Sequence, residues 1–578
     1  MQMKMLAALA AVALSGCATN ALQDRASAPV EVKIIALNDF HGNLEKPNVS
    51  ADATDASGAT VKVPTGGAAW LAAAVQQLRG QNPNHAVISA GDLISASPLT
   101  SSLFLDEPTV TAMNMIGLDF NAAGNHEFDR GRAELLRMQN GGCEKHTSRQ
   151  PCRVEPFQGA SFGFLAGNTV TEDGGTLFPA YGIRSFGEGA AQVKVGFIGL
   201  TLKGTNNLVI PSSVAGLTFA DEAATANALV PRLKAEGADA IILVIHEGGY
   251  TKGGYQGCED LSGPIVDIMK RLDPAIDVIA SGHTHRAYVC DNAAVDPARP
   301  FLLTSAGTKG AILTDITLSI DPVAGRVVAK RAENILVQND GYDSAEGAVR
   351  PTDAAPRLAP DPRVAALVSR YAAAAKAEAN RIVAPFPQRL SQDKNRAGEN
   401  ALGSLIADAQ LAAARAPAQG GAELAFMNSG GVRAALDPGE DGQLTFGDLY
   451  AVQPFGNIVT VLTYNGAQIR RMLEQQYAPG NTGDRLLPSH NVRYSYDARK
   501  PQGQQVSDIL IDGRPVEDGR SYRLAVPNFL ASGGGGITVF TEGRDPFYGV
   551  EDIEALEAYL RTNPAVPVAN RITQLDPE

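Results

Sequence analysis

Short apolar runs that end in glycine and polar residues recur through the first half of this chain, and they constrain its fold more than any other feature. Runs of about four to eight apolar residues bounded by glycine are typical of strands buried on both faces of a sheet. Helical patterns, such as 66–79 and 220–236, fill gaps between them, and this alternation predicts an α/β core. The expected strands are 32–37, 85–90, 118–123, 239–245 and 277–280, then 301–305 and 312–320, the last alternating as if one face of its sheet were exposed.

The residues that follow five of these strands are of the types that bind divalent metal ions. They are Asp39, His41, Asp92, Asn125, His246, His283 and His285. In α/β folds ligands bind outside the carboxyl ends of the strands. Carboxylates, imidazoles and an amide suit Zn, Mn, Co or Mg and contain too much nitrogen for Ca. Seven ligands suit a pair of ions bridged by one carboxylate, and Asp92, alone on its strand end, is the natural bridge. We therefore expect a two-metal centre of the kind that activates phosphate esters.

Each of these residues also has a simpler interpretation. Asp39 and Asp92 could be helix N-caps, and His246 could be a core histidine. The hexapeptide from Gly124 to Asp129 could form an Asx-type turn before a helix. These interpretations do not explain why four of the eight histidines in the chain lie at the strand ends.

Five motifs, in this order, resemble the calcineurin-like metallophosphoesterase domain of the bacterial 5′-nucleotidase and UDP-sugar hydrolase family. They are Asn-Asp-Phe-His-Gly at 38–42, Gly-Asp at 91–92, Gly-Asn-His-Glu-Phe-Asp at 124–129, His-Glu-Gly at 246–248 and Gly-His-Thr-His at 282–285. The resemblance implies a four-layer αββα sandwich. It assigns one metal ion to Asp39, His41, Asp92 and His285, and the other to Asp92, Asn125, His246 and His283. His126 would stabilise charge on the transferring phosphoryl group, and Asp129 would orient its imidazolium.

A second group of motifs lies toward the end of the chain, at Arg396, 428–433, 453–457 and 528–534. Taken singly, they could be turn glycines, a solvated arginine and core phenylalanines. Together they resemble the 5′-nucleotidase C-terminal domain. This resemblance implies that Arg396 and Arg433 hold anionic or polar substrate groups, that Phe455 and Phe529 stack a base, and that Asn428 and Asn457 make further contacts. The family commonly has an Asp that binds the ribose hydroxyls where this chain has Gly535.

The motifs and the composition together divide the chain. We expect a lipoprotein signal peptide at 1–17, a tether at 18–29, a metallophosphoesterase domain at 30–349, a linker at 350–385 and a C-terminal α+β substrate-binding domain at 386–578. Asp361-Pro362 is a plausible helix cap followed by a first-turn proline. The linker is therefore expected to contain a helix over 363–382.

The start of the chain predicts export. Lys4, an apolar run over 5–14 and Leu14-Ser15-Gly16-Cys17 resemble a bacterial signal peptide with a lipobox, in which Cys17 becomes lipidated. Ala18 then implies sorting to the outer membrane, facing the periplasm or the cell surface. The alternative is an ordinary secretory signal with an incidental cysteine.

The other four cysteines suit the disulfides of an oxidising compartment. Cys143 and Cys152 lie nine positions apart in a polar, loop-like stretch, so we pair them, and Cys258 then pairs with Cys290. A zinc–thiolate cluster is the competing interpretation, although no C-x-x-C spacing is present.

The net charge of −13 argues against a nucleic-acid polymer as partner. We expect a monomer with a small nucleotide substrate, which contacts a membrane only through its lipid. The leading hypothesis is an exported two-metal phosphohydrolase, in which hydroxide attacks phosphorus in line in 5′-nucleoside monophosphates, with UDP-sugars and nucleoside diphosphates as further substrates. The alternatives are a 2′,3′-cyclic-nucleotide phosphodiesterase or a sulfur-ester hydrolase on the same scaffold, and a binding lipoprotein without catalysis.

Overall fold

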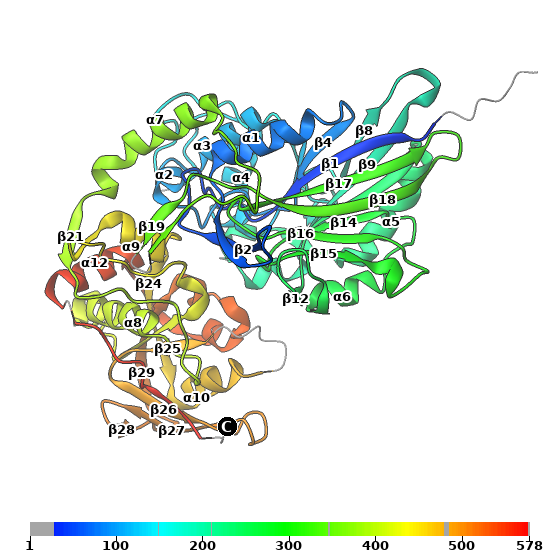
Figure 1. Ribbon diagram of the computed structural model, residues 1–578. Helices are drawn as coiled ribbons and strands as arrows, with labels where there is room; N and C mark the ends of the chain where they lie inside the picture. Colours follow the sequence, from blue (N-terminus) through cyan, green and yellow to red (C-terminus); the bar gives the residue numbers. More distant parts are fainter. Residues whose placement is uncertain are drawn as a thin grey trace, which may run out of the picture.

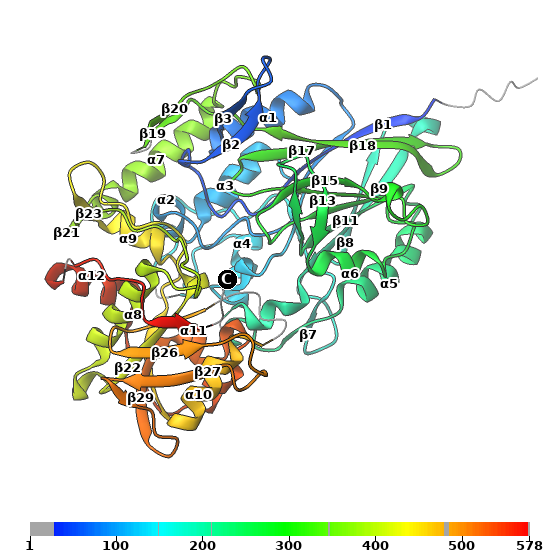
Figure 2. The same cartoon turned by 60° about the horizontal axis from the view of Figure 1, so that its bottom comes forward.

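The computed structural model describes residues 28–147, 149–209, 211–344, 347–478, 485–563 and 565–575. The expected signal peptide, Cys17 and most of the tether lie outside the described residues. Two domains lie next to each other, and one long helix runs between them (Figures 1 and 2). No helix in the described ranges is long and apolar enough to cross a membrane.

Two six-stranded sheets form the centre of the N-terminal domain. The first has the strand order β18-β17-β1-β4-β5-β6 and the second β15-β16-β14-β11-β9-β8. The bounds in the first sheet are β1 Val30–Leu37, β4 His85–Ser89, β5 Phe120–Ala122, β6 Gly163–Leu165, β17 Ile312–Asp321 and β18 Arg326–Leu336. In the second they are β8 Tyr181–Phe186, β9 Val193–Thr201, β11 Ala240–His246, β14 Val278–Ser281, β15 Ala287–Asp291 and β16 Leu302–Ala306. β1, β4, β5 and β6 run parallel, as do β9, β11, β14 and β16.

The two sheets pack face to face. Val32, Ile34 and Ile88 of the first sheet share a buried cluster with Phe197 and Ile242 of the second. Because side chains alternate along a strand, the intervening residues point toward the outside of the sandwich. The apolar runs in the sequence are therefore needed to fill both faces of each sheet.

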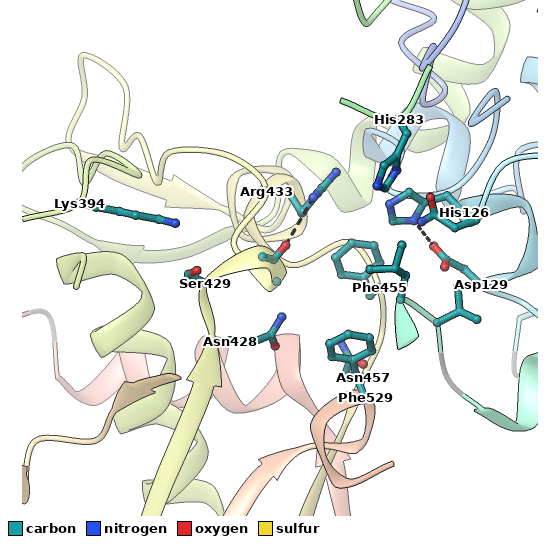
Figure 3. A pocket seen from close by; sticks show the side chains of 15 residues that line it. His126, Asp129, His283, Lys394, Asn428, Ser429, Arg433, Phe455, Asn457 and Phe529 are labelled. Atoms are coloured by element: carbon teal, nitrogen blue, oxygen red, sulfur yellow. Dashed lines mark hydrogen bonds and ion pairs between the residues drawn. The ribbon is translucent and has the colours of Figure 1, made fainter. Parts of the chain in front are cut away.

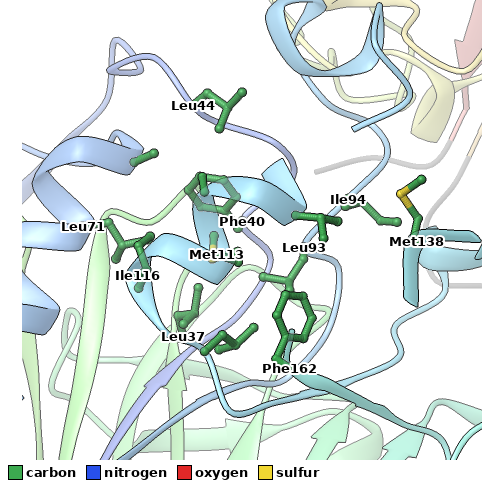
Figure 4. Close-up of a cluster of buried hydrophobic side chains, with 14 of the residues drawn as sticks. Leu37, Phe40, Leu44, Leu71, Leu93, Ile94, Met113, Ile116, Met138 and Phe162 are labelled. Carbon is green, nitrogen blue, oxygen red and sulfur yellow. The ribbon is translucent and has the colours of Figure 1, made fainter. Parts of the chain in front are cut away.

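Helices cover the outer faces of the sheets. The first sheet carries α1 (Ala68–Arg79), α3 (Glu107–Ile116) and α4 (Arg132–Asn140), and the second carries α5 (Glu222–Ala235) and α6 (Pro264–Met269). Figure 4 shows Leu71 of α1 and Met113 of α3 near Leu37, which ends β1. The order of layers is helix, sheet, sheet, helix, which confirms the predicted αββα sandwich.

One expectation about the sheets is wrong. The alternation over 312–320 predicts an exposed face, yet β17 is buried on both sides. Ile316 and Leu318 lie between the sheets, and Asp315 on the opposite face is only 4% exposed. Its Oδ2 lies 2.6 Å from Lys33 Nζ. The polar residue that suggests solvent instead pairs with a buried lysine of the neighbouring strand.

The expected linker helix is present as α7 (Pro362–Ala379). Asp361 caps it, because its Oδ1 accepts hydrogen bonds from the backbone N–H of Arg363 at 2.8 Å and of Val364 at 3.1 Å. Tyr371 of α7 is buried in the N-terminal core, with its ring centroid 5.0 Å from that of Phe104. The helix therefore packs on the N-terminal domain before the chain enters β21 (Ile382–Pro385), which pairs with β23 (Gln443–Thr445).

A five-stranded sheet organises the C-terminal domain, with the order β25-β22-β29-β24-β30. One face packs against α8 and α12, and the other against α10 and a four-stranded sheet of order β28-β27-β26-β31. The strand bounds are β22 Leu424–Asn428, β24 Ile458–Asn465, β25 Leu486–Pro488, β26 Val492–Tyr496, β27 Val506–Ile511, β28 Arg514–Pro515, β29 Ser521–Pro527, β30 Arg544–Glu551 and β31 Ile572–Gln574. The helices are α8 Ala401–Ala414, α10 Gly466–Gln475 and α12 Asp552–Thr562. This agrees with the predicted α+β domain.

Both predicted disulfides are confirmed. Cys143 pairs with Cys152 and Cys258 pairs with Cys290, with Cα–Cα distances of 5.5 and 5.2 Å. The competing zinc–thiolate interpretation is therefore wrong for these four cysteines.

Candidate active site

The strand ends bring all seven predicted metal-binding residues into one cluster. β1 leads into Asp39 and His41, β4 into Asp92, β5 into Asn125, and β14 into His283 and His285, while β11 ends at His246. Glycines allow this convergence. A Cβ on Gly91 would lie 2.5 Å from His246 Nδ1, and one on Gly124 would lie 2.2 Å from Asp92 Oδ1.

The ligand atoms form two adjacent groups. Asp39, His41 and His285 make up one, and Asp92, His246 and His283 the other, with the ligand atoms of each group within 4.8 Å of one another. Asp92 lies between the groups, because its Oδ2 is 3.0 Å from His246 Nε2 and 3.7 Å from His41 Nε2. Asn125 joins the second group, with Oδ1 3.2 Å from His246 Nε2.

Hydrogen bonds determine which nitrogen of two histidines faces the cluster. His41 Nδ1 lies 2.9 Å from the Ser95 carbonyl oxygen, and His246 Nδ1 lies 2.7 Å from that of Ala90, so both Nδ1 atoms carry protons. In the neutral rings, the Nε2 lone pairs then face inward, where His41 Nε2 meets His285 Nε2 at 3.2 Å. Without metal, one of these two nitrogens must carry a proton, and a bound cation would take the place of that proton. The two groups of inward-facing carboxylate and imidazole atoms fit two divalent ions.

The pKa values of the histidines agree with metal binding. Burial lowers the pKa of His41 to about 3 and that of His283 to about 4, so both rings are neutral ligands. Burial also disfavours a charged His246, but the Asp92 carboxylate outweighs it and raises the pKa of His246 to about 10. Without metal, a proton on His246 supplies the positive charge that Asp92 attracts, and a bound ion would displace that proton.

Backbone strain is concentrated at the same residues. The φ angles of Asp39, His41, Asp92, His283 and His285 are 50°, 46°, 51°, 71° and 57°. Side-chain-bearing residues rarely adopt this left-handed region, and such strain gathers at functional sites. Hydrogen bonds hold it in place: the His41 N–H donates to the Asp92 carbonyl oxygen at 2.9 Å, and the Asp39 N–H to that of Gly91 at 2.9 Å.

Sequence reasoning assigned no role to Glu127, although it lies inside the hexapeptide. Its carboxylate accepts hydrogen bonds from the backbone N–H of Asp92 at 2.9 Å, Leu93 at 2.9 Å and Gly124 at 2.6 Å. Burial and the neighbouring Asp92 raise the pKa of Glu127 to about 7. It ties the β4 end to the β5 end behind the metal cluster. Its position inside the Gly-Asn-His-Glu-Phe-Asp motif, directly after Asn125 and His126, is the sequence signal that could have identified it.

His126 and Asp129 form a hydrogen-bonded pair beside the cluster. His126 begins the one-turn 3₁₀ helix His126–Phe128 and Asp129 directly follows it, and His126 Nδ1 lies 2.7 Å from Asp129 Oδ2. The His126 N–H donates to Asp92 Oδ1 at 2.9 Å, which fixes the ring next to the bridging carboxylate. Burial opposes the charged ring, but Asp129 and Asp92 together raise the pKa of His126. The ring is thus suited to meet an anion as an imidazolium.

A cleft of about 350 Å³ lies between the two domains (Figure 3). The N-terminal domain contributes His126, Asp129, Asn125 and His283 to its lining. The C-terminal domain contributes five of the predicted substrate residues, which are Asn428, Arg433, Phe455, Asn457 and Phe529. Residues that lie far apart in the sequence therefore share one cavity.

Arg396 is an exception among the predicted residues. It is exposed and does not line the cleft, whereas Lys394 does. The chain reverses at this point, because the Gly398 N–H donates to the Asn395 carbonyl oxygen at 2.9 Å and the Asn395 N–H to that of Glu399 at 2.8 Å. This turn separates two neighbouring cations, and Lys394 is the one of the two that lines the cleft. A substrate contact by Arg396 stays a prediction.

Phe455 and Phe529 lie close together in Figure 3, with Phe455 nearer to His126. The ring centroids of Phe455 and His126 are 5.6 Å apart and the ring planes differ by 9°, so the rings stack. The Arg433 guanidinium lies 5.6 Å from the Phe455 centroid. Phe529 is the second residue of α11 (Asn528–Ala531). Its ring packs against Gly534, where a Cβ would lie only 2.6 Å from the ring, so a side chain at this position would displace it.

The polar lining of the C-terminal side is mostly neutral or cationic. Asn457 Nδ2 donates to the buried Asp552 Oδ2 at 3.2 Å, so part of its amide is engaged inside the domain. Gly535 lies in a glycine turn at φ 70° and offers no side chain. Among the described residues that line the cleft, Asp129 is the one carboxylate, and it is paired with His126.

Comparison with known proteins agrees with both halves of the site. The family described as "Calcineurin-like phosphoesterase" matches residues 32–287, and "5'-nucleotidase, C-terminal domain" matches 373–542. A protein named endonuclease YhcR from Bacillus subtilis is 30% identical over 93% of this chain, which spans 40% of that relative's length. A 5′-nucleotidase from Vibrio cholerae is 26% identical over 97% of this chain and 96% of its own.

The fold is also found among solved structures. The 5′-nucleotidase precursor from Thermus thermophilus has a TM-score of 0.73 at 24% identity, with 95% of this chain and 100% of that chain covered. The two family models match the two domains in order, and the Vibrio relative matches nearly the full length of the chain. The structure adds two groups of metal-binding residues at the predicted strand ends. The chain belongs to the 5′-nucleotidase family of calcineurin-like metallophosphoesterases and is a metal-dependent phosphoester hydrolase.

Proposed function

We propose that this chain removes the phosphate from 5′-nucleoside monophosphates. The observation that carries the proposal is the single cleft in which His126 and Asp129 of one domain face Phe455, Phe529 and Arg433 of the other. Such a cleft offers a place for a phosphate at the metal cluster and for a base between or beside the two phenyl rings. The relatives named 5′-nucleotidase support the same class of substrate.

The roles of the residues follow from their positions. One divalent ion would be held by Asp39, His41 and His285. The other would be held by Asn125, His246 and His283, and Asp92 would contact both ions. The ions would supply Lewis-acid polarisation of the phosphoryl oxygens and activation of water. His126, charged and held at Nδ1 by Asp129, would donate a hydrogen bond from Nε2 to the phosphoryl group as negative charge grows on it. Arg433 would add a second positive charge from the opposite wall.

Substrate entry requires movement of the domains. Phe455 stacks directly on the His126 ring, so a base can stack on this face of Phe455 only when the C-terminal loop shifts or the domains rotate. A cross-link that fixes the two domains in this arrangement should abolish turnover, while leaving bound metal unchanged. Full turnover by the cross-linked protein would contradict this step.

A second candidate activity follows from the lining of the cleft. Because no carboxylate on the described C-terminal lining is available for the ribose hydroxyls, selectivity for a nucleoside could be weak. UDP-sugars, 2′,3′-cyclic nucleotides and sulfur esters are then the competing substrates, and the name of the Bacillus relative adds an oligonucleotide.

A substrate panel tests these alternatives directly. Each substrate is incubated with Mn, Zn, Co or Mg and its own product is measured. The products are phosphate from AMP and from an aryl phosphate, UMP and glucose 1-phosphate from UDP-glucose, a 2′- or 3′-monophosphate from 2′,3′-cyclic AMP, and shorter fragments from a short oligonucleotide. We expect metal-dependent preference for AMP. Activity on the aryl phosphate alone would keep the metal chemistry and discard the nucleotide, and a protein that binds no metal would support the binding-lipoprotein alternative.

We also propose that the protein is exported as a monomer and anchored by lipid at Cys17. Two disulfides support an oxidising compartment. A Cys17→Ala variant should move from the outer-membrane fraction to soluble or inner-membrane fractions, without change in the activity of the folded domains. Retention in the outer membrane would contradict lipidation at this residue.

A further inference from the structure

The loop closed by the Cys143–Cys152 disulfide reaches across the domain boundary through Arg149. The Arg149 guanidinium donates to the Ser102 carbonyl oxygen of its own domain at 3.0 Å and to the Tyr450 hydroxyl of the C-terminal domain at 2.8 Å. Its Cζ also lies 5.1 Å from the centroid of the Tyr450 ring. Tyr450 belongs to α9 (Phe446–Val452) and is 1% exposed, so this contact is largely shielded from water.

Tyr450 connects this contact to the loop that carries Phe455. Its hydroxyl donates to the Pro454 carbonyl oxygen at 3.0 Å. Pro454 directly precedes Phe455, whose ring stacks on His126. The Tyr450 hydroxyl accepts a hydrogen bond from the Arg149 guanidinium and donates one to a carbonyl oxygen, so its orientation is fixed. The bond from Arg149 is the stronger of the two, because its donor is charged. The position of the Pro454 peptide therefore depends on Arg149.

Glu551 contributes from the other side of the same loop. Its carboxylate interacts electrostatically with Arg149, and the residue ends β30, where it pairs in register with Ile458. Glu551 Oε2 lies 3.8 Å from the place a Cβ would occupy on Gly456. Arg149 thus interacts with groups on both flanks of 454–457, although it belongs to the metal-binding domain.

We propose that Arg149 is a positioning residue that sets where Phe455 lies against the active site, and thereby how well a base is bound. It acts through Tyr450 and Pro454 and does not line the cleft itself. The disulfide limits the conformations of the loop, which keeps the guanidinium presented to Tyr450. The inference rests on the proposed function in one respect, namely that Phe455 stacks the base of the substrate.

Substitutions at both ends of the contact test the proposal. Arg149→Ala removes the cation, and Tyr450→Phe removes the hydroxyl but keeps the ring in the core. Arg153→Ala is the matched control, because Arg153 lies just beyond the disulfide and contacts Leu103 and the Phe104 ring of its own domain. Arg149→Lys retains a charge and should recover part of the effect.

The kinetic readout separates positioning from general stability. For AMP we expect KM to rise about tenfold in Arg149→Ala and Tyr450→Phe with kcat changed less than about twofold. KM for ribose 5-phosphate, which has no base, should stay unchanged, as should both constants in Arg153→Ala. A purely structural role would instead lower kcat for both substrates together.

Hydrogen exchange gives a readout that needs no substrate. Amides of 453–457 should exchange faster in Arg149→Ala and Tyr450→Phe than in the wild type, and not in Arg153→Ala. If the wild type does not prefer AMP over ribose 5-phosphate, the proposed nucleotidase function fails, and exchange alone then decides the role of Arg149. Unchanged exchange at 453–457, or equal rises of KM for both substrates, would overturn the inference.

Discussion

The two walls of the cleft differ in how their side chains are held. On the metal side, Asp39, Asp92 and His246 are at most 1% exposed and lie at or just beyond the ends of buried strands. Hydrogen bonds to backbone groups join these strand ends to one another. On the other wall, Phe455 and Phe529 are only half-buried and lie on a loop and a four-residue helix. In the proposed function, rigid strand ends carry the chemistry, and loops, which tolerate change, carry recognition. Loss of a metal-side residue should abolish the reaction, whereas loss of a residue on the other wall should change which substrates bind.

The largest effect is expected for Asp92→Asn. The neutral amide can no longer balance two divalent ions, so we expect fewer than two ions per chain and kcat/KM lower by about a thousandfold or more. Metal analysis and AMP hydrolysis measure both quantities. His85→Gln is the control, since His85 begins β4 at the end opposite the cluster and should leave metal content unchanged. Full activity of Asp92→Asn would remove the distinction between the two walls.

The second largest effect is expected for His126→Gln. His126 lies where the two walls of the cleft meet. Glutamine can donate a hydrogen bond but cannot carry the charge that Asp129 and Asp92 favour, so kcat should fall by about a hundredfold to ten-thousandfold. Metal content should stay at the wild-type value. Asp129→Asn should produce a smaller fall of the same kind. A loss of metal in His126→Gln would show that this ring supports the ions and not the phosphoryl group.

Phe455→Ala tests the recognition wall. Loss of stacking should raise KM for AMP by about tenfold, within the about 1–3 kcal/mol that one base–aromatic contact contributes. Ribose 5-phosphate should be hydrolysed as before or faster, because the substitution also uncovers His126. An equal fall in kcat for both substrates would place Phe455 with the chemistry.

The last prediction concerns stability and pH, and it leaves the chemistry of the cleft unchanged. Burial raises the pKa of Asp552, which accepts from Asn457, to about 7. The folded protein then retains a proton that the unfolded chain loses near pH 4. The contribution of Asp552 to the free energy of unfolding therefore falls as pH rises from about 4 to 7, by up to about 1.4 kcal/mol per pH unit, and is constant above about pH 7. The difference in thermal midpoint between Asp552→Asn and the wild type should be more favourable to the variant at pH 8 than at pH 5. A difference that does not vary with pH would exclude this titration.

Local patterns were sufficient for much of the metal wall. Apolar runs that end in Gly-Asp or Gly-Asn-His place their polar residues at the carboxyl edge of a parallel sheet whatever the rest of the chain does. For that reason Asp92, His246 and His283 could be found without a structure, and the pairing of Cys143 with Cys152 followed from a spacing of nine residues.

The recognition wall was less accessible to such reasoning. A turn at 395–399 leaves Arg396 outside the cleft and places Lys394 in it, and no periodicity distinguishes two cations separated by one residue. Likewise, the sequence pattern predicts that Asp315 faces solvent, because it gives no sign that Asp315 pairs with Lys33 of the neighbouring strand.

The sequence by itself determined an α/β core, the metal-binding residue types and the presence of a second domain, because each depends on patterns within short segments. The four-layer αββα order was implied by the family resemblance. Only the tertiary structure decided that Phe455 lies on His126, that Glu127 ties two strand ends together and that Arg149 reaches Tyr450. The largest of these separations is that between His126 and Phe455, which lie more than 300 positions apart in the sequence. Their geometry is set by how the two domains pack, and no local pattern records it.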